Sequence, residues 1–204
     1  MRPDEIGSTR LIREATAARK IPLREYDLSA VRANTGVIFQ DFVRYHMTAA
    51  ENIAVGRIEA RDDRARIVLA AERSLAEEVI AKLPNGYDQV IGKVFRGGLD
   101  LSGGEWQKIA IARAYMRDAQ VLILDEPTAA LDARSEFEVF QRFKELSRDK
   151  TAILISHRFS SVRMADRIVV LADGTVEATG THEELLEQQG RYAELFELQA
   201  AGYR

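Results

Sequence analysis

The sequence predicts an α/β fold built on a mainly parallel sheet. Two short apolar runs, Val121–Leu124 and Ala152–Ile155, each end abruptly at polar residues. A continuous apolar run of this length is typical of a strand that is buried on both faces, as the strands of parallel sheets are. Helical segments alternate with these strands along the chain, and that order brings parallel strands into one sheet with helices packed on it.

The N-terminal half contains one further strand and a helical stretch. Residues 37–39 (VIF) follow a glycine and predict a short buried strand. From residue 48 to about residue 83 the sequence is rich in Ala, Glu, Arg and Leu and has no proline, which predicts helix. The sequence LPNG at residues 83–86 then predicts a turn.

Helix starts and a hairpin are signalled in the second half. Ser102 stands three residues before Glu105, the spacing of a capping box, and predicts a helix that runs to about residue 117. Residues 133–148 predict another helix. Asp173-Gly174 lies between two β-rich runs and predicts a hairpin. Thr181 repeats the capping-box spacing before a single closing helix, expected from residue 183 to about residue 201.

Composition narrows the class of protein. The chain has 204 residues, which fits one compact domain with room for a subordinate lobe. Hydrophobic residues make up 46% and charged residues 30%, an ordinary balance for a globular chain, and there is no cysteine to form disulfides or thiolate metal sites. The net charge of −3 gives no general attraction to nucleic acid. No apolar run approaches the roughly 20 residues that span a bilayer.

Two acidic residues follow the strand at residues 121–124. Open α/β sheets bind ligands at the carboxyl ends of their strands, and Asp125 and Glu126 stand at such an end. In nucleoside triphosphatases an acid at this position holds Mg²⁺ against the phosphates, and a second carboxylate can polarise the attacking water. Taken alone, the pair is equally consistent with two ordinary surface acids.

Two more features allow both a chemical and a structural interpretation. His157 follows the strand at residues 152–155, where an imidazole can contact a γ-phosphate or orient water. In isolation such a histidine is more often structural. Ser102, Gly103 and Gly104 open a helix whose N-terminal end and exposed N–H groups suit an anion. The alternative is an ordinary N-cap with glycines in the turn.

The order of these features decides the interpretation. LSGGEWQKIAIARA, VLILDEPTAALD and ILISHR follow one another closely, and from about residue 23 to residue 204 the chain resembles the ATP-binding cassette family. The resemblance implies a P-loop NTPase-like core with a helical subdomain inserted at about residues 42–117. It also implies ATP and Mg²⁺ as ligands.

The resemblance implies a role for each motif residue. Asp125 and Gln40, the Q-loop glutamine, would serve Mg²⁺, while Glu126 would be the catalytic base and His157 the switch histidine. Gln40 would also sense the transport domain. The nucleotide would contact the signature motif and the D-loop, through Ser102, Gly103, Gly104, Glu105 and Asp132.

Other segments resemble cassettes of the exporter type, namely Asn52-Ile53, Tyr87-Asp88, GTHEEL at residues 180–185 and RYAELFELQ at residues 191–199. A transmembrane domain and a second cassette, paired head to tail, are the implied partners, with no nucleic acid. The implied location is peripheral, on the cytoplasmic side of the inner membrane. Residues 1–22 are expected to be a leader outside the resemblance.

The phosphate-binding sequence G-x-x-x-x-G-K-[ST] occurs nowhere in the 204 residues. Gly7-Ser8-Thr9 is a partial echo without the lysine. We therefore expect a truncated cassette, without its first strands, that is inactive alone. The alternatives are a non-catalytic subunit that donates its signature motif to an intact cassette, and a fragment without a stable fold, whose uncovered sheet edge would favour aggregation.

Overall fold

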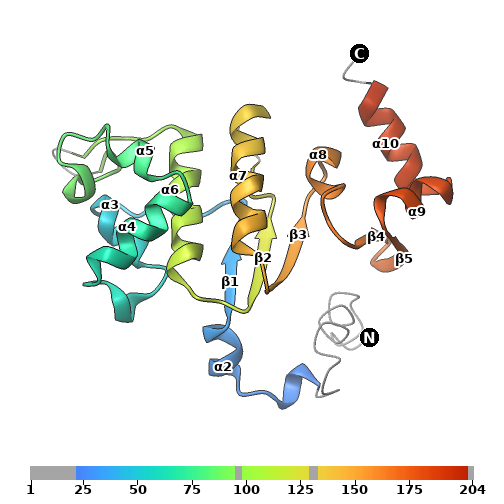
Figure 1. Cartoon of the computed structure of the whole chain (residues 1–204), viewed down its shortest axis with the longest axis horizontal. Helices are drawn as coiled ribbons and strands as arrows, with labels where there is room; N and C mark the ends of the chain where they lie inside the picture. Colours follow the sequence, from blue (N-terminus) through green and yellow to red (C-terminus); the bar gives the residue numbers. More distant parts are fainter. Residues whose placement is uncertain (1–21, 95–97, 129–132, 202–204) are drawn as a thin grey trace. The chain divides into compact units, whose positions relative to one another are not determined.

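The structure is a computed structural model that describes residues 22–94, 98–128 and 133–201. It divides into two compact units, residues 31–155 and a second made of residues 1–30 and 156–204, and each is described by itself. Figure 1 labels the α-helices and strands up to residue 155, and the elements in this range are η2 Leu23–Glu25, α2 Leu28–Ala33, β1 Thr35–Ile38, α3 Ala49–Ala54, η3 Ile58–Ala60, α4 Arg64–Arg73, α5 Glu77–Ile80, η4 Gly86–Asp88, α6 Gly103–Met116, β2 Val121–Asp125, α7 Ala133–Leu146 and β3 Thr151–Ile155.

A parallel sheet of order β1-β2-β3 forms the centre of the first unit. The register pairs Ile38 with Leu124 across β1 and β2, and Asp125 with Ile155 across β2 and β3. All three strands therefore end at the same edge of the sheet. The parallel α/β core expected from the apolar runs is confirmed. The first strand begins at Thr35 and ends at Ile38, slightly earlier than residues 37–39.

One face of this sheet carries a core of its own, the sheet cluster. Its buried members come from strands β1 and β2, from the residues just before β2 and from helices α6 and α7. They are Ile38, Ile111, Ala114, Ala119, Leu122, Leu124, Val139, Phe140, Phe143 and Leu146. The other face is more open, since Val37 is 39% and Ile155 50% exposed and Ile123 is half-buried. Burial on both faces was therefore a wrong expectation for the described residues, because the helices of this unit cover one face only.

A second core, the helical cluster, lies among α3, α4, α5 and α6, which Figure 1 shows gathered beside the sheet. Trp106, fully buried, is its largest member. The helical stretch from residue 48 is broken into short helices. Arg57 adopts an extended conformation after α3, and Leu75 has a φ of 63° after α4. Gly56, directly before Arg57, was a signal for the first break, whereas no glycine or proline stands at Leu75, so composition alone predicted a longer helix.

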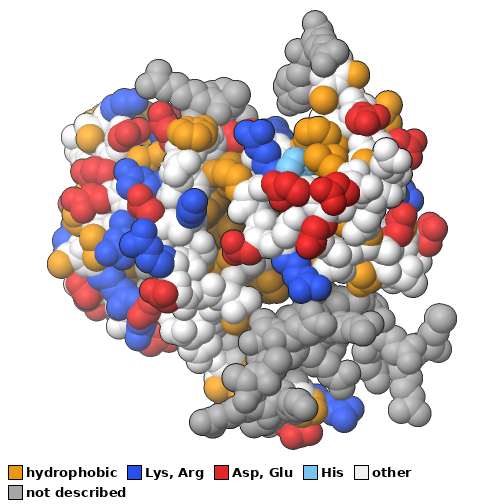
Figure 2. Space-filling model, turned by 45° about the vertical axis from the view of Figure 1, so that its right-hand side comes forward, with side chains coloured by type: hydrophobic (Ala, Val, Ile, Leu, Met, Phe, Trp, Pro, Cys, Tyr) orange, Lys and Arg blue, Asp and Glu red, His pale blue; other side chains and the backbone are white. Residues whose placement is uncertain are grey.

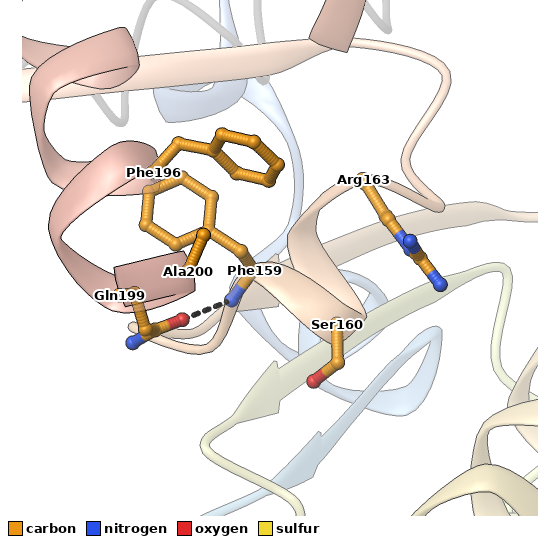
Figure 3. Close-up of a pocket in the computed structure, with 6 residues that line it drawn as sticks. All are labelled: Phe159, Ser160, Arg163, Phe196, Gln199 and Ala200. Carbon is orange, nitrogen blue, oxygen red and sulfur yellow. Dashed lines mark hydrogen bonds between the residues drawn. The ribbon is translucent and has the colours of Figure 1, made fainter. Parts of the chain in front are cut away.

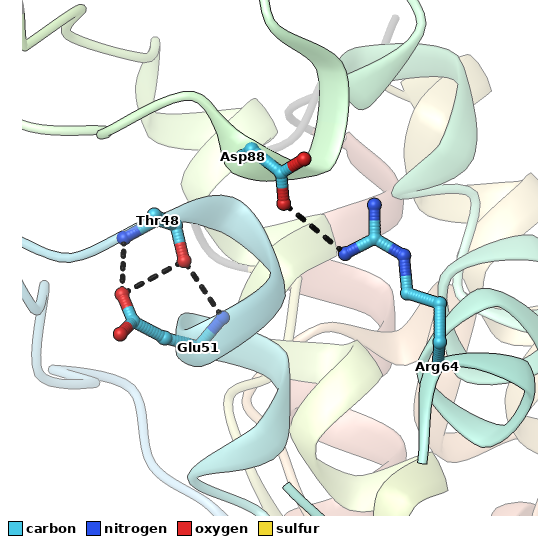
Figure 4. Close-up of polar contacts among 4 residues, drawn as sticks. All are labelled: Thr48, Glu51, Arg64 and Asp88. Atoms are coloured by element: carbon cyan, nitrogen blue, oxygen red, sulfur yellow. Dashed lines mark hydrogen bonds and ion pairs between the residues drawn. The ribbon is translucent and has the colours of Figure 1, made fainter. Parts of the chain in front are cut away.

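Polar contacts stabilise helices α3 and α4 at the surface of the helical cluster. Thr48 and Glu51 form a capping box at the start of α3, and Arg64 of α4 pairs with Asp88 at 3.4 Å (Figure 4). The Arg64–Asp88 pair is exposed and contributes at most about 1 kcal/mol. Figure 2 shows Lys and Arg side chains interspersed with Asp and Glu on the visible face, the usual pattern of a solvated surface.

The second unit contains α8 Phe159–Val162, the antiparallel hairpin of β4 Ile168–Ala172 and β5 Thr175–Gly180, α9 His182–Glu187 and α10 Arg191–Ala201. The hairpin at Asp173-Gly174 and the capping box of Thr181 are confirmed. A single closing helix was a wrong prediction. Helix α9 ends at its cap Gln188, Gln189 has a φ of 49°, and Gly190 precedes α10. A left-handed residue beside a glycine ends a helix.

Candidate functional site

The carboxyl edge of the sheet collects the polar residues of two neighbouring strands. Gln40 follows β1 by two residues, and Asp125 is the last residue of β2. Because Ile38 is paired with Leu124, both lie at the same edge of the sheet. Gln40 is exposed, while Asp125 and Glu126 are half-buried. This edge is where open parallel sheets bind ligands, and Gln40, Asp125 and Glu126 all stand at or just beyond the ends of strands that finish there. Their shared role in binding a nucleotide stays a prediction.

Glu126 turns the chain away from the sheet in an unusual conformation. Its φ is 43°, in the left-handed region that residues with a side chain rarely adopt. Its N–H donates to the carbonyl of Ile155 at 2.9 Å, so the residue is still tied to β3. Such a backbone costs about 1 kcal/mol or more and persists where the surroundings fix it. The carboxylate is thereby held directly beyond the strand end.

The signature turn is a fully formed helix start. Ser102 has an extended backbone and caps α6, its Oγ accepting from the Glu105 N–H at 3.3 Å. The Glu105 carboxylate accepts from the Ser102 N–H and hydroxyl, both at 2.8 Å. Ser102 is exposed and Gly103 and Gly104 are half-buried, so this end of a 14-residue helix is accessible to an anion. The capping box predicted from the spacing is confirmed.

Gln107 links this turn to the acidic pair within the same unit. The residue is 3% exposed, and its Nε2 donates to the carbonyl of Pro127, which follows Glu126. Its Oε1 accepts no hydrogen bond among the described residues. Pro127 is itself fully buried. Gln107 therefore ties α6 to the chain beside Glu126.

The segment after Gln40 is anchored by Arg113, an α6 residue that the sequence did not single out. Its Nε donates to the Asn52 carbonyl at 2.9 Å, one Nη to the Asn52 Oδ1 at 2.8 Å and the other to the Val43 carbonyl at 2.7 Å. Its guanidinium also lies 5.0 Å from the ring centre of Tyr45. Burial lowers the pKa of Arg113 to about 10.

Asn52 completes this arrangement from α3. It is fully buried, and its Nδ2 donates to the carbonyls of Tyr45, Met47 and Thr48 at 2.9, 3.3 and 3.1 Å. We call Asn52 and Arg113 the polar hub. It holds residues 43–48, which lead from Gln40 into α3, against the helix of the signature turn. An arginine within the apolar run IAIARA was the one signal in the sequence that pointed to a buried charge.

His157 belongs to the second unit, two residues beyond β3. Its side chain is exposed, and its carbonyl accepts from Gln199 Nε2 at 3.2 Å. A pocket of about 210 Å³ lies beside this loop and is lined by Phe159, Ser160, Arg163, Phe196, Gln199 and Ala200 (Figure 3). The meeting of His157 with Glu126 around a triphosphate stays a prediction. Asp132 lies outside the described residues.

Comparison with known proteins identifies the family of this chain. A family profile described as "ABC transporter" matches residues 7–129, more than half of the chain. The chain belongs to the ABC transporter family. The matched range begins inside residues 1–22, the segment that we expected to be a leader. None of the helices in the described ranges combines the length and the apolar composition needed to cross a membrane.

Relatives of this cassette include flippases and an ABC exporter. ATP-dependent lipid A-core flippases of Alkalilimnicola ehrlichii and Escherichia coli are 46% and 44% identical over 181 and 177 residues, covering 89% and 87% of this chain. The structure of a bacterial Atm1-family ABC exporter with ATP bound has a TM-score of 0.80 and 37% identity over 89% of this chain. The cassette spans 30% of the length of each flippase and 31% of that exporter chain. It is an exporter-type nucleotide-binding domain with the P-loop NTPase-like fold.

Proposed function

We propose that this cassette takes part in ATP hydrolysis that drives export, together with a transmembrane domain and a second cassette at the cytoplasmic face of the membrane. One observation carries the proposal. The capped signature turn of α6 and the Asp125–Glu126 pair at the sheet edge are built in one unit and joined through Gln107. The exporter relatives support the same class of activity.

Mg²⁺ fits this edge when it arrives with a triphosphate. No group of three or more His, Cys, Asp or Glu side chains within the described ranges could hold a metal by itself. Magnesium is commonly held by one or two carboxylates plus phosphate oxygens and water, and Asp125 with Gln40 supplies that protein share. When bound, the ion would neutralise charge on the β- and γ-phosphates.

The remaining residues act on water and on phosphate. Glu126 accepts a proton from the attacking water, as a carboxylate held just beyond a strand end can do. His157 contacts the γ-phosphate. Ser102, Gly103 and Gly104 present N–H and hydroxyl groups to the phosphates bound by the opposite cassette, and Asp132 follows in the D-loop.

The phosphates themselves must be held by a segment outside these 204 residues, which contain no G-x-x-x-x-G-K-[ST] sequence. The isolated chain should therefore have negligible ATPase activity. Turnover that survives purification and disappears in Glu126→Gln would overturn this. The same observation favours a second candidate, a non-catalytic subunit that only donates its signature turn.

Pairing can be tested with the excised cassette of the Escherichia coli flippase, carrying a Gln in place of its catalytic Glu so that ATP is retained. Sedimentation velocity with Mg-ATP should show a mixed pair that Ser102→Arg abolishes. The control, Thr175→Arg, adds the same charge at the exposed hairpin and should pair normally. A pair that forms equally well with Ser102→Arg would refute the proposal.

The coding sequence upstream of Met1 separates the two candidates. A frame that encodes G-x-x-x-x-G-K-[ST] supports hydrolysis by this cassette. A promoter in its place supports the pairing subunit.

A further inference from the structure

Gln199 joins α10 to the loop that carries His157. The Phe159 N–H donates to Gln199 Oε1 at 3.0 Å, the bond drawn in Figure 3, and Gln199 Nε2 donates to the His157 carbonyl at 3.2 Å. One side-chain amide thus bridges the backbone on both sides of Arg158. The bridge connects residues that are about 40 positions apart in the sequence, so it is a tertiary contact and not part of a local turn.

Serine hydroxyls hold the same loop from within. Ser156 Oγ lies 2.9 Å from Ser161 Oγ, and the Arg158 N–H donates to Ser156 Oγ at 3.0 Å. Ser161 is fully buried, and its hydroxyl also donates to the Arg158 carbonyl at 2.8 Å. The loop is therefore shaped by bonds inside it and by the amide that reaches it from α10.

Aromatic contacts tie α10 to the base of the loop. The Phe159 ring packs edge-on against Tyr192 and Phe196 of α10, with ring centres 5.1 and 5.3 Å apart. His182 of α9 packs against the same two rings, and its Nδ1 lies 2.8 Å from the Tyr192 hydroxyl. The position of α10 is thus fixed by a ring cluster, and Gln199 transmits that position to the backbone of His157.

We propose that Gln199 is a positioning residue for His157, so that the packing of α10 against the ring cluster sets the orientation of the loop that carries His157. The functional meaning of this inference rests on the role proposed for His157. It assigns α10 a regulatory part, because a partner that draws α10 away from the ring cluster removes both bonds of the amide bridge. Packing of α10 would then control when His157 faces a nucleotide.

The three histidines of the chain make the test specific, since each reports on a different place. His157 reports on the loop, His182 on the seating of α10, and His46 on the other unit. Ring proton signals and the hydrogen exchange of the Phe159 N–H are measured by NMR for the full chain and for Gln199→Leu. The matched control is Glu197→Leu, which removes a polar end from an exposed residue of the same helix.

Gln199→Leu should shift the His157 signals and leave those of His182 and His46 in place, while Phe159 exchange accelerates roughly two- to tenfold, as loss of one hydrogen bond predicts. Glu197→Leu should change neither. His157 signals and Phe159 exchange that match the wild type in Gln199→Leu would overturn the proposal.

A shift of His182 as well means that the variant has unseated α10, and Gln199→Glu then decides. Its carboxylate still accepts from Phe159 but cannot donate to His157. His157 signals that move while Phe159 stays protected support the proposal, and unchanged His157 signals refute it. None of these measurements uses ATP, so a failure of the proposed hydrolysis leaves their result intact.

Discussion

Replacing Arg113 with methionine tests the polar hub. Methionine keeps most of the apolar stem but removes the three hydrogen bonds to Asn52 and Val43. Bonds from a charged donor contribute about 1.5–3 kcal/mol each, or roughly 4–9 kcal/mol for three. Burial lowers the pKa of Arg113 to about 10, a cost on the order of 3 kcal/mol at neutral pH that the variant recovers. The expected net loss of stability, which is the hydrogen-bond loss less this recovered cost, is about 1–6 kcal/mol.

Trp106 is a local reporter for this measurement. It is the single tryptophan of the chain, and it is fully buried in the helical cluster that α6 shares with α3 and α4. Urea unfolding followed by its fluorescence should give a much lower midpoint for Arg113→Met. Arg113→Lys should lose nearly as much, because one ammonium group cannot reach the acceptors that a planar guanidinium serves.

The control is Arg73→Met, an exposed arginine on α4. Surface substitutions of this kind usually change stability by no more than about 0.5 kcal/mol. If Arg113→Met and Arg73→Met unfold at the same urea concentration, the hub does not hold the segment after Gln40, and the reasoning from its hydrogen bonds is wrong.

Three further outcomes are expected. Glu105→Gln should lower the Kd of the ATP-dependent mixed pair roughly fivefold. The Glu105 carboxylate and the phosphates bound by the opposite cassette are both negative, and two like charges a few ångströms apart repel by about 1 kcal/mol in water. An unchanged Kd in sedimentation would contradict this. Burial, and then the charge of Glu145, raise the pKa of Tyr115 to about 12. The wild type should therefore lose stability between pH 10 and pH 12, where the unfolded chain ionises first, and Tyr115→Phe should lose less, as urea midpoints by circular dichroism at pH 8 and pH 11 can show. Gly56→Ala places a Cβ 2.1 Å from a carbonyl oxygen of α6 and should cost about 1–3 kcal/mol or more, whereas Gly190→Ala, with no atom within 4 Å, should unfold like the wild type.

Local signals predicted local structure well. The capping boxes of Ser102 and Thr181 followed from spacing, because both partners lie within one helical turn. The box of Thr48 has the same spacing and could have been predicted too. The break at Gln189 was missed because glutamine seldom adopts a positive φ, although the glycine after it was a signal.

The tertiary contacts could not be predicted from the sequence. Arg113 and Asn52 are 61 positions apart, and Gln199 and His157 are 42 apart. No periodicity or spacing rule connects such residues, since only the packed fold brings them together. At the candidate site, the structure shows that Gln40 and Asp125 stand at the carboxyl ends of neighbouring strands, an order of strands that the sequence did not predict. The contribution of His157 to the same site is still a prediction.

Helix α6 has a consequence for how this domain tolerates sequence change. None of its 14 residues is exposed, because its sides supply Trp106, Ile109, Ala112 and Met116 to the helical cluster and Ile111 and Ala114 to the sheet cluster. In a saturation library scored by soluble expression, this helix should be the least permissive stretch. Evolution of the domain would then be confined to its outer loops and surface helices, while α6 changes only together with compensating partners on both sides.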